Sequence, residues 1–269
     1  MPTSLSIIIV SFNARADLER CLASLHNPPP DAPHEILVVD NASTDGSLEA
    51  TRGWPDVKTI ENGRNLGFAA ACNVGIRASG GANLLLLNSD TVVPPHAIDR
   101  LLADLNAHPE AAVVGPRLVD ATGRAELSFG RMIGPLTELR QKRLLRAYER
   151  GEPGAVATVD RLTRAEHTPD WVSGACLLVR RTDAEAVNLL DERFFMYTED
   201  VDFCASIRAR GRVVRFTPDV EIVHARGRSV AAAPEATNDA YRRSQLAFYR
   251  KHHPAWIPFL RMYLWLSGA

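Results

Sequence analysis

Apolar residues in the first half of this chain form short continuous runs, of which the four leucines at 84–87 are the sharpest. A run of this kind is typical of a strand that is buried on both faces of a parallel sheet. Runs at 5–10, 35–39 and 111–114 have the same character, and 57–60 is shorter. We therefore predict five strands in this half.

The segments between these runs have a helical period. Apolar residues follow the spacing i, i+3, i+4, i+7 from Leu18 to Leu25 and again from Ile98 to Leu105, which predicts two amphipathic helices. Small residues dominate 68–78, where we expect a helix that packs closely on the sheet. Strands and helices thus alternate, and this order predicts an α/β fold whose mostly parallel sheet has helices on both faces.

The pattern changes near residue 118, where glycine and proline interrupt it. We expect a basic helix at 139–150 and an irregular stretch at 151–168, together forming an insertion over the sheet edge where a second substrate could bind. Thr198 is the expected cap of a later helix. The remaining predicted elements are a strand at 171–179, a helix at 183–189, the helix from 198 to about 210, strands at 213–216 and 220–223, and a last helix at 236–253.

Composition narrows the class of protein. The 269 residues are 46% hydrophobic and 23% charged with a formal net charge of -1, as in an ordinary soluble protein without bulk nucleic-acid binding. The four cysteines form no C-x-x-C motif, which favours reduced thiols. The first strand starts too early for a signal peptide, and no apolar run reaches the ~18 residues of a membrane span. We therefore expect a cytoplasmic protein.

Polar residues follow several predicted strands. Asp40, the Asn88-Ser89-Asp90 segment and His224 each come directly after an apolar run, and Glu199-Asp200 starts a predicted helix. Each group alone has an ordinary explanation, such as a turn, a helix-dipole partner or a structural histidine. Because ligands bind at the carboxyl ends of strands in open α/β sheets, the groups together predict a metal-dependent site for a phosphate ester. Mg²⁺ suits the carboxylates, whereas an imidazole ligand favours Mn²⁺.

The first strand-to-helix turn, Ser11 to Arg15, lacks the glycines of a dinucleotide-binding loop. Instead, an ordered set of motifs resembles glycosyltransferase family 2, and within it the bacterial rhamnosyltransferase-like branch. The resemblance runs from residue 5 to about 253. Its motifs are Val10-Ser11-Phe12-Asn13, Val39-Asp40-Asn41-Ala42-Ser43-Thr44-Asp45-Gly46, Asn65-Leu66-Gly67-Phe68-Ala69 with Asn73-Val74-Gly75, Leu87-Asn88-Ser89-Asp90, Ser173-Gly174-Ala175, and Phe195-Met196-Tyr197-Thr198-Glu199-Asp200-Val201-Asp202.

The resemblance implies a GT-A fold and an inverting transfer from a nucleoside-diphosphate sugar, with dTDP or UDP as the expected nucleotide and rhamnose or a similar hexose as the sugar. It places Ser11, Asn13 and Asp40 at the base and ribose. It further implies donor contacts from Asn65, Gly67 and Asn73 near the ribose and phosphates, and from Asn88 and Ser89.

The resemblance also implies the metal and catalytic residues. Asn88-Ser89-Asp90 corresponds to the family's D-x-D motif with its first aspartate replaced by asparagine, which leaves Asp90 as the direct carboxylate ligand. His224 corresponds to a late metal ligand and Asp200 to the catalytic base. Trp171, Gly174 and Glu199 correspond to the acceptor pocket. Arg228, with Arg226, would add charge at the diphosphate or, equally, be a solvated surface arginine.

The expected organisation is a GT-A domain at 1–235, divided into a nucleotide-sugar half at 1–116 and an acceptor half at 117–235, followed by a helical tail at 236–269. Aromatic, basic and apolar residues interleave after residue 240. This pattern suits a membrane surface, and equally a helix that packs on the protein itself or on another subunit of a homodimer. The expected acceptor is a cell-envelope glycan or a lipid-linked sugar.

Two other functions fit an α/β protein with acidic strand ends. A sugar-phosphate nucleotidyltransferase would need a glycine-rich basic loop where the chain has Ser11-Phe12-Asn13. A non-catalytic nucleotide-sugar-binding module would not need both Asp90 and Asp200. The absence of that loop and the presence of both aspartates favour the transferase.

Overall fold

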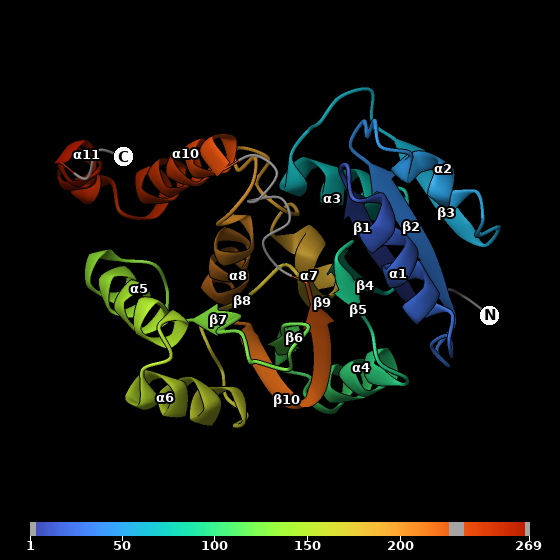
Figure 1. The fold of residues 1–269 in the computed structure, drawn as a ribbon, viewed down its shortest axis with the longest axis horizontal. Helices are drawn as coiled ribbons and strands as arrows, with labels where there is room; N and C mark the ends of the chain where they lie inside the picture. The colour runs from blue at the N-terminus through green and yellow to red at the C-terminus, as the bar shows by residue number, and fades with distance from the viewer. Residues whose placement is uncertain (1–3, 226–233, 267–269) are drawn as a thin grey trace.

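Eight strands of the computed structural model, which describes residues 4–225 and 234–266, form a sheet in the order β3-β2-β1-β4-β9-β6-β10-β5 (Figure 1). The first four strands run parallel. The strands are β1 (Leu5–Ser11), β2 (His34–Asp40), β3 (Val57–Glu61), β4 (Asn83–Asn88), β5 (Thr91–Val92), β6 (Ala111–Val119), β9 (Cys176–Arg180) and β10 (Val213–His224), and a separate ribbon pairs β7 (Phe129–Gly130) with β8 (Trp171–Val172).

Helices cover both faces of the sheet, as predicted. The buried side chains of α1 and α4 pack on one face, and those of α3 and α8 on the other. The helices are α1 (Arg15–Leu25), α2 (Ser47–Thr51), α3 (Phe68–Arg77), α4 (Ala97–Ala107), α5 (Pro135–Glu149), α6 (Pro153–Thr163), α7 (Arg181–Ala186), α8 (Glu199–Ala209), α10 (Pro234–His252) and α11 (Ile257–Leu266), with a 3-10 turn η1 (Pro254–Trp256) between the last two.

Two strands break the parallel pattern. β9 lies antiparallel between β4 and β6, and β5 pairs antiparallel with the end of β10. An apolar run such as β9 is buried on both faces in either direction, so its sequence carries no sign of orientation. The predicted division at 116/117 falls inside β6, which pairs with both β9 and β10, and the two proposed halves therefore share one sheet.

Three predicted elements have different bounds in the structure. The strand predicted at 171–179 is interrupted, because residues 173–175 form a turn between β8 and β9. The stretch 151–168 is not irregular: it contains α6, whose Ala155 and Val159 pack against Tyr148 of α5. The two strands predicted between 213 and 223 are one strand, β10, with a register irregularity between Thr217 and Glu221.

The predicted C-terminal tail is packed on the rest of the protein. Ser244 of α10 donates a hydrogen bond to the Met196 carbonyl at 2.7 Å. Near the end of the same helix, Lys251 donates to Asp202 of α8 at 2.7 Å, and a ring nitrogen of His252 lies 2.6 Å from the other oxygen of that carboxylate. α10 is therefore braced against the first turn of α8.

Candidate active site

The carboxyl ends of β1 and β2 hold two buried polar atoms without hydrogen-bond partners in the described part of the chain. Ser11 and Asp40 lie opposite each other in the sheet. The Ser11 hydroxyl and Asp40 Oδ1 are unpartnered, whereas Asp40 Oδ2 accepts a hydrogen bond from the Ser43 amide at 2.9 Å. An unpaired buried polar atom costs free energy, so atoms of this kind at the ligand-binding edge of a sheet indicate a place for a polar ligand.

Asn13 joins two loops at this edge. Its side-chain oxygen accepts a hydrogen bond from the Thr44 amide at 2.8 Å, and its own amide donates to the Ser43 hydroxyl at 2.9 Å. Phe12, between Asn13 and Ser11, keeps 46% of its surface exposed. The loops thus present an aromatic ring beside the unpaired polar atoms, a feature that the sequence patterns had not singled out.

The loop before α3 touches the segment that leads into α8. Gly67 has φ +83°, and a Cβ atom there would lie 2.2 Å from the Phe195 carbonyl oxygen, so no side chain fits. The next amide, that of Phe68, donates to this carbonyl at 2.7 Å. Asn65 supports the turn by accepting a hydrogen bond from the Gly67 amide at 2.9 Å. Asn65 and Gly67 therefore shape a loop that is joined to the segment leading into α8.

Asn73 holds the loop that follows α7. Its amide nitrogen donates to the Leu190 carbonyl at 2.8 Å and to Glu192 at 2.9 Å, and its oxygen accepts from the Leu190 amide at 3.1 Å. The side chain is buried. Its polar atoms are used in these bonds, and its predicted contact with the donor stays a prediction.

Asp90 and His224 meet because β5 pairs with the end of β10. Thr91 lies opposite His224 in the register, and the Ala225 amide donates to the Asp90 carbonyl at 2.9 Å. His224 Nε2 then lies 3.3 Å from Asp90 Oδ1 and 3.4 Å from the Asn88 side-chain nitrogen. The structure thus brings the predicted D-x-D counterpart and the predicted late ligand together, although 134 residues separate them in the chain.

Glu126 is a member of this cluster that the sequence did not reveal. It is buried, and both its carboxylate oxygens lie 3.2 Å from His224 Nδ1. Burial of the ring opposes protonation, but the hydrogen bonds to Asp90 and Glu126 outweigh it and raise the pKa of His224 to about 9. A single glutamate in a segment without a clear period gives no signal of this contact in the sequence.

The start of α8 has strained backbone. Tyr197 and Thr198 both adopt left-handed conformations, with φ 68° and 64°, which is costly for side chains of this size. Thr198 occupies the predicted cap position, but its hydroxyl makes no capping hydrogen bond and has no partner among the described residues, so the predicted capping bond was wrong. Directly after these two residues, Asp200 meets the 173–175 turn at Gly174.

The carboxylates of Glu199 and Asp200 differ in their hydrogen-bond partners. Asp200 Oδ2 accepts a hydrogen bond from the Gly174 amide at 2.9 Å and Oδ1 one from the Val201 amide at 2.8 Å, whereas buried Glu199 Oε2 has no hydrogen-bond partner among the described residues. Burial raises the pKa of Asp200 above its ordinary value. Burial, with the charge of Asp200, raises the pKa of Glu199 well above its ordinary value. Both carboxyls are therefore more basic than exposed acids of the same type.

The 173–175 turn connects the two clusters. The Gly174 amide bonds Asp200, and the carbonyl of the next residue, Ala175, accepts from the Asn88 amide at 2.9 Å. Gly174 and Ala175 are consecutive residues, so their Cα atoms are only about 3.8 Å apart. A Cβ at Gly174 would lie 3.3 Å from Phe68 Cε1, closer than most Cβ contacts, and in ordinary contact with Asp200 Cβ at 3.5 Å. The segment that carries Asp90 and the carboxylate of Asp200 are therefore held by consecutive residues of one turn.

Trp171 lies at the entrance to this turn. It is half-buried, and its indole nitrogen donates to the Arg131 carbonyl at 2.9 Å, so the ring is fixed between β7 and α5. Ser89 is buried beside Asp90. Arg228, the last predicted donor contact, lies outside the described residues.

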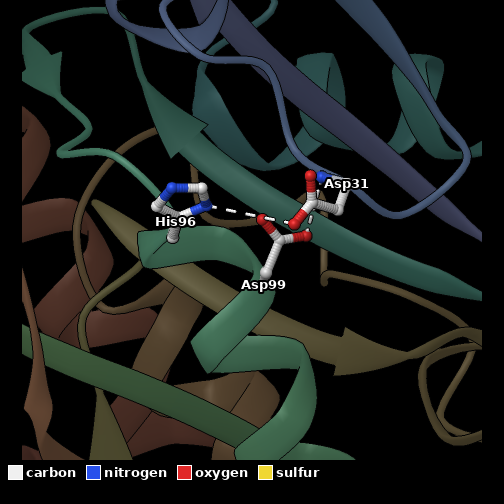
Figure 2. Close-up of side chains that lie close together, drawn as sticks. All are labelled: Asp31, His96 and Asp99. Carbon is white, nitrogen blue, oxygen red and sulfur yellow. Dashed lines mark hydrogen bonds and ion pairs between the residues drawn. The ribbon is translucent and has the colours of Figure 1, made fainter.

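A second group of possible metal ligands lies elsewhere (Figure 2). Asp31, His96 and Asp99 bring one ligand atom each within 4.8 Å of one another. Asp31 and His96 are exposed, and Asp99 accepts hydrogen bonds from the amide of Asp31 at 3.0 Å. Asp31 precedes β2 whereas Asp40 ends it, and a strand of this length spans about 20 Å. Asp40, Ser11 and Asn88 end neighbouring strands at one edge of the sheet, so this group lies toward the other edge, away from the cluster around Asp90.

Comparisons with known proteins show the family of the chain. The model of the family "Glycosyl transferase family 2" matches residues 6–161. The N-acetylglucosaminyl-diphospho-decaprenol L-rhamnosyltransferase of Mycobacterium tuberculosis is 31% identical, over 95% of this chain and 87% of that protein. The low-salt glycan biosynthesis hexosyltransferase Agl10 of Haloferax volcanii is 25% identical, over 83% of this chain and 68% of its own.

A solved structure has the same fold at lower identity. The mannosyltransferase PcManGT from Pyrobaculum calidifontis, in complex with GDP-Man and Mn²⁺, superposes with a TM-score of 0.65 at 20% identity, over 97% of this chain and 70% of that one. The sheet, its helices and their order are therefore those of the GT-A fold, as predicted.

Proposed function

Because the chain belongs to glycosyltransferase family 2 and is thus a glycosyltransferase, we propose that it transfers rhamnose or a similar hexose, with inversion, from a dTDP- or UDP-sugar to a cell-envelope glycan or lipid-linked acceptor. The observation that carries the proposal is the 173–175 turn, which holds Asn88 and Asp200 by consecutive residues. The turn couples a cluster suited to a diphosphate and its cation to a carboxylate suited to proton transfer.

The donor nucleotide would bind at the ends of β1 and β2. The unpaired Ser11 hydroxyl and Asp40 Oδ1 offer polar partners to a pyrimidine base and its ribose. The exposed ring of Phe12 offers a stacking surface for the base. Asn13, Asn65 and Gly67 shape the loops around this place.

The cluster of Asp90 and His224 fits a divalent cation. Two ligands at right angles on one cation, each about 2.1 Å from it, lie about 3.0 Å apart, and Asp90 Oδ1 and His224 Nε2 are 3.3 Å apart. Glu126 bonds Nδ1 and so leaves Nε2 to face Asp90, the usual arrangement behind a metal-ligating histidine. Mg²⁺ or Mn²⁺ held here supplies positive charge opposite the departing diphosphate.

Asp200 would act as the general base. The amides of Gly174 and Val201 fix its carboxylate, and its raised pKa makes it a better proton acceptor than an exposed aspartate. The acceptor hydroxyl gives its proton to Asp200 while its oxygen bonds to the anomeric carbon, and the bond from that carbon to the diphosphate breaks on the opposite face. The chain then needs no nucleophile of its own, and inversion follows.

The acceptor would lie between Trp171, Gly174 and Glu199. The name of the mycobacterial relative supports a diphospholipid-linked sugar as acceptor and rhamnose as the transferred sugar. A lipid-linked acceptor would place the enzyme at the inner face of the plasma membrane, with the C-terminal helices as the contact. A cytoplasmic location and a homodimer remain predictions.

A thermal-shift panel of nucleotide-sugars with Mn²⁺, Mg²⁺ or EDTA tests this proposal. We expect dTDP-rhamnose or a UDP-hexose to raise the melting temperature only when a divalent cation is present, because diphosphate and protein share its coordination. Transfer to a diphospholipid-linked acceptor should follow with the same donor. Equal stabilisation by all nucleotide-sugars in EDTA would contradict the proposed site.

A further inference from the structure

Large exposed apolar side chains gather at one end of the molecule. Of the eight that the described residues expose, five lie on α5 and the segment from η1 to α11. They are Leu136 and Leu139 on α5, and Trp256, Phe259 and Met262 on the C-terminal segment. We call these residues, together with the arginines described below, the α5–α11 surface. Large apolar side chains exposed in a group of this kind mark a candidate interaction site.

α11 is apolar on both of its sides. Ile257, Leu260 and Leu264 belong to the cluster that packs around Phe248 and Tyr249 of α10. On the outer side, Phe259 and Met262 remain 58% and 55% exposed. A helix at the surface of a water-exposed protein ordinarily has a polar outer side, whereas Arg261 is the single charged residue of α11. The outer side of α11 therefore lacks the character of a solvated face.

α5 adds positive charge beside it. Leu136, Leu139, Arg140, Arg143 and Arg146 are all exposed, and their spacing of three or four residues places them along one stripe of the helix. The stripe begins apolar and continues basic. Its exposed acid, Glu149, lies in the last turn.

The other acid of α5 faces the protein. Glu138 accepts a hydrogen bond from the Tyr249 hydroxyl of α10 at 3.1 Å, and Lys142 pairs with it at 2.7 Å. The inner side of α5 is thus fixed on α10, and the outward charge of its first three turns is positive.

The segments that lead into α5 and α11 are in contact. A ring nitrogen of His253 lies 2.8 Å from the Ile133 carbonyl oxygen, and Met132 and Ile133 pack in the same cluster as Ile257. Figure 1 shows both helices at the same end of the molecule, with α11 past the end of α10 and α5 below α10. Because α10 is braced on α8 through Lys251 and Asp202, this surface is joined to the helix that carries Asp200.

We propose that the α5–α11 surface docks on an anionic lipid bilayer, with Trp256, Phe259 and Met262 in the interface and the arginines of α5 on the headgroups. The proposal rests on the proposed lipid-linked acceptor and names the surface that would bring the enzyme to it. Stable peripheral binding takes two signals, apolar insertion and a basic patch, and this surface has both. No helix in the described ranges is long and apolar enough to cross a bilayer.

A second copy of the chain fits the α5–α11 surface less well than an anionic bilayer does. A symmetric dimer through this surface would place the same patch on both partners, so the arginine stripes would approach each other. Like charges at close range are unfavourable, whereas anionic headgroups complement them.

Vesicle co-sedimentation of the full chain tests the proposal, using phosphatidylcholine vesicles with and without phosphatidylglycerol. We expect binding only to the anionic vesicles. The double variant Phe259→Ser/Met262→Ser should bind about tenfold more weakly because it loses apolar burial. Arg140→Glu/Arg143→Glu should weaken binding by more than about tenfold, and added salt should reduce wild-type binding. Val156→Ser, which removes a comparably exposed side chain from α6, should bind as the wild type does.

Equal vesicle binding by the wild type and both double variants would overturn the proposal. So would a wild-type dimer in light scattering that Phe259→Ser/Met262→Ser converts to a monomer, since the surface would then belong to a second copy. Cation-dependent stabilisation by a nucleotide-sugar should be the same in all variants. That measurement tests the transferase proposal separately and shows that each variant is folded.

Discussion

The two acidic clusters on either side of the 173–175 turn differ in how their charge is balanced. In the cluster of Asp90 and Glu126, a histidine lies between the carboxylates, and their hydrogen bonds raise the pKa of His224 to about 9. No ion pair with Glu199 or Asp200 forms within the described ranges 4–225 and 234–266, and burial raises the pKa of both acids.

This difference separates two chemical tasks. Two carboxylates that stabilise a protonated imidazole would also stabilise a divalent cation in the same place, once His224 Nε2 has given up its proton to become a ligand. A buried carboxyl beside a half-buried one that two backbone amides fix is suited to proton transfer. The same residue type would thus serve as ligand in one cluster and as base in the other, according to what surrounds it.

Loss of the cation should have the largest effect. We expect EDTA to abolish transfer and Asp90→Ala to remove the dependence of nucleotide affinity on Mn²⁺ or Mg²⁺, because the cation needs ligands from both protein and diphosphate. Isothermal titration of nucleotide with and without cation measures this coupling. Asp31→Ala is the matched control: it removes an acid of the exposed group in Figure 2 and should leave the coupling intact. Full activity in EDTA would contradict the assignment of Asp90 as a metal ligand.

Asp200→Asn comes second. The substitution keeps the shape of the side chain but removes its basicity, so kcat should fall by ~10²–10⁴-fold. Donor affinity should change by less than roughly 1 kcal/mol, because Asp200 acts on the acceptor. Kinetics, donor titration and a melting curve on one sample measure all three quantities. If Asp200 only complements the helix dipole, the variant would stay active and lose ~0.3–1 kcal/mol of stability.

The third acid of α8 sharpens the comparison. Asp202 is as buried as Glu199 but is compensated by Lys251 at 2.7 Å and His252 at 2.6 Å. Lys251→Met should therefore lower the free energy of unfolding by about 1–3 kcal/mol, since the buried carboxylate loses a charged partner. Arg250→Met, which changes the exposed neighbouring residue, should leave the free energy of unfolding nearly unchanged. Denaturant unfolding of the two variants compares them, and equal stabilities would show that the brace is unimportant.

Glu199→Gln should give the smallest effect, and one that depends on pH. A carboxyl with a raised folded-state pKa favours the folded protein at low pH, and this stability is lost as pH rises from the ordinary glutamate pKa through the raised one. Glutamine does not titrate, so the stability of the variant relative to the wild type should increase across that window, by at most about 1.4 kcal/mol per pH unit. Melting curves at several pH values measure it. If the difference in stability between variant and wild type does not change with pH, Glu199 does not have the raised pKa. In the same variant, kcat should fall less than in Asp200→Asn.

Local pattern predicted most elements of the fold. Strands β1 to β4 and helices α1, α3 and α4 follow from apolar runs and helical periods that each lie within one element. The prediction failed at α6 and at the 173–175 turn. α6 is stabilised by packing on Tyr148, and the turn forms because Ser128, Asp200 and Asn88 bond it from other elements. Such contacts are non-local, so no window of sequence contains them.

By itself, then, the sequence determined the alternation of strands and helices, the polar residues at the strand ends and, through its motifs, the family. Only the tertiary structure decided that β9 runs antiparallel, that Glu126 supports His224, that Asn73 holds a loop and that α10 braces α8. The physical reason is the range of the interactions. Burial patterns repeat along the chain and are readable from it, whereas a hydrogen bond between Glu126 and His224 depends on two segments that meet only when β10 enters the sheet.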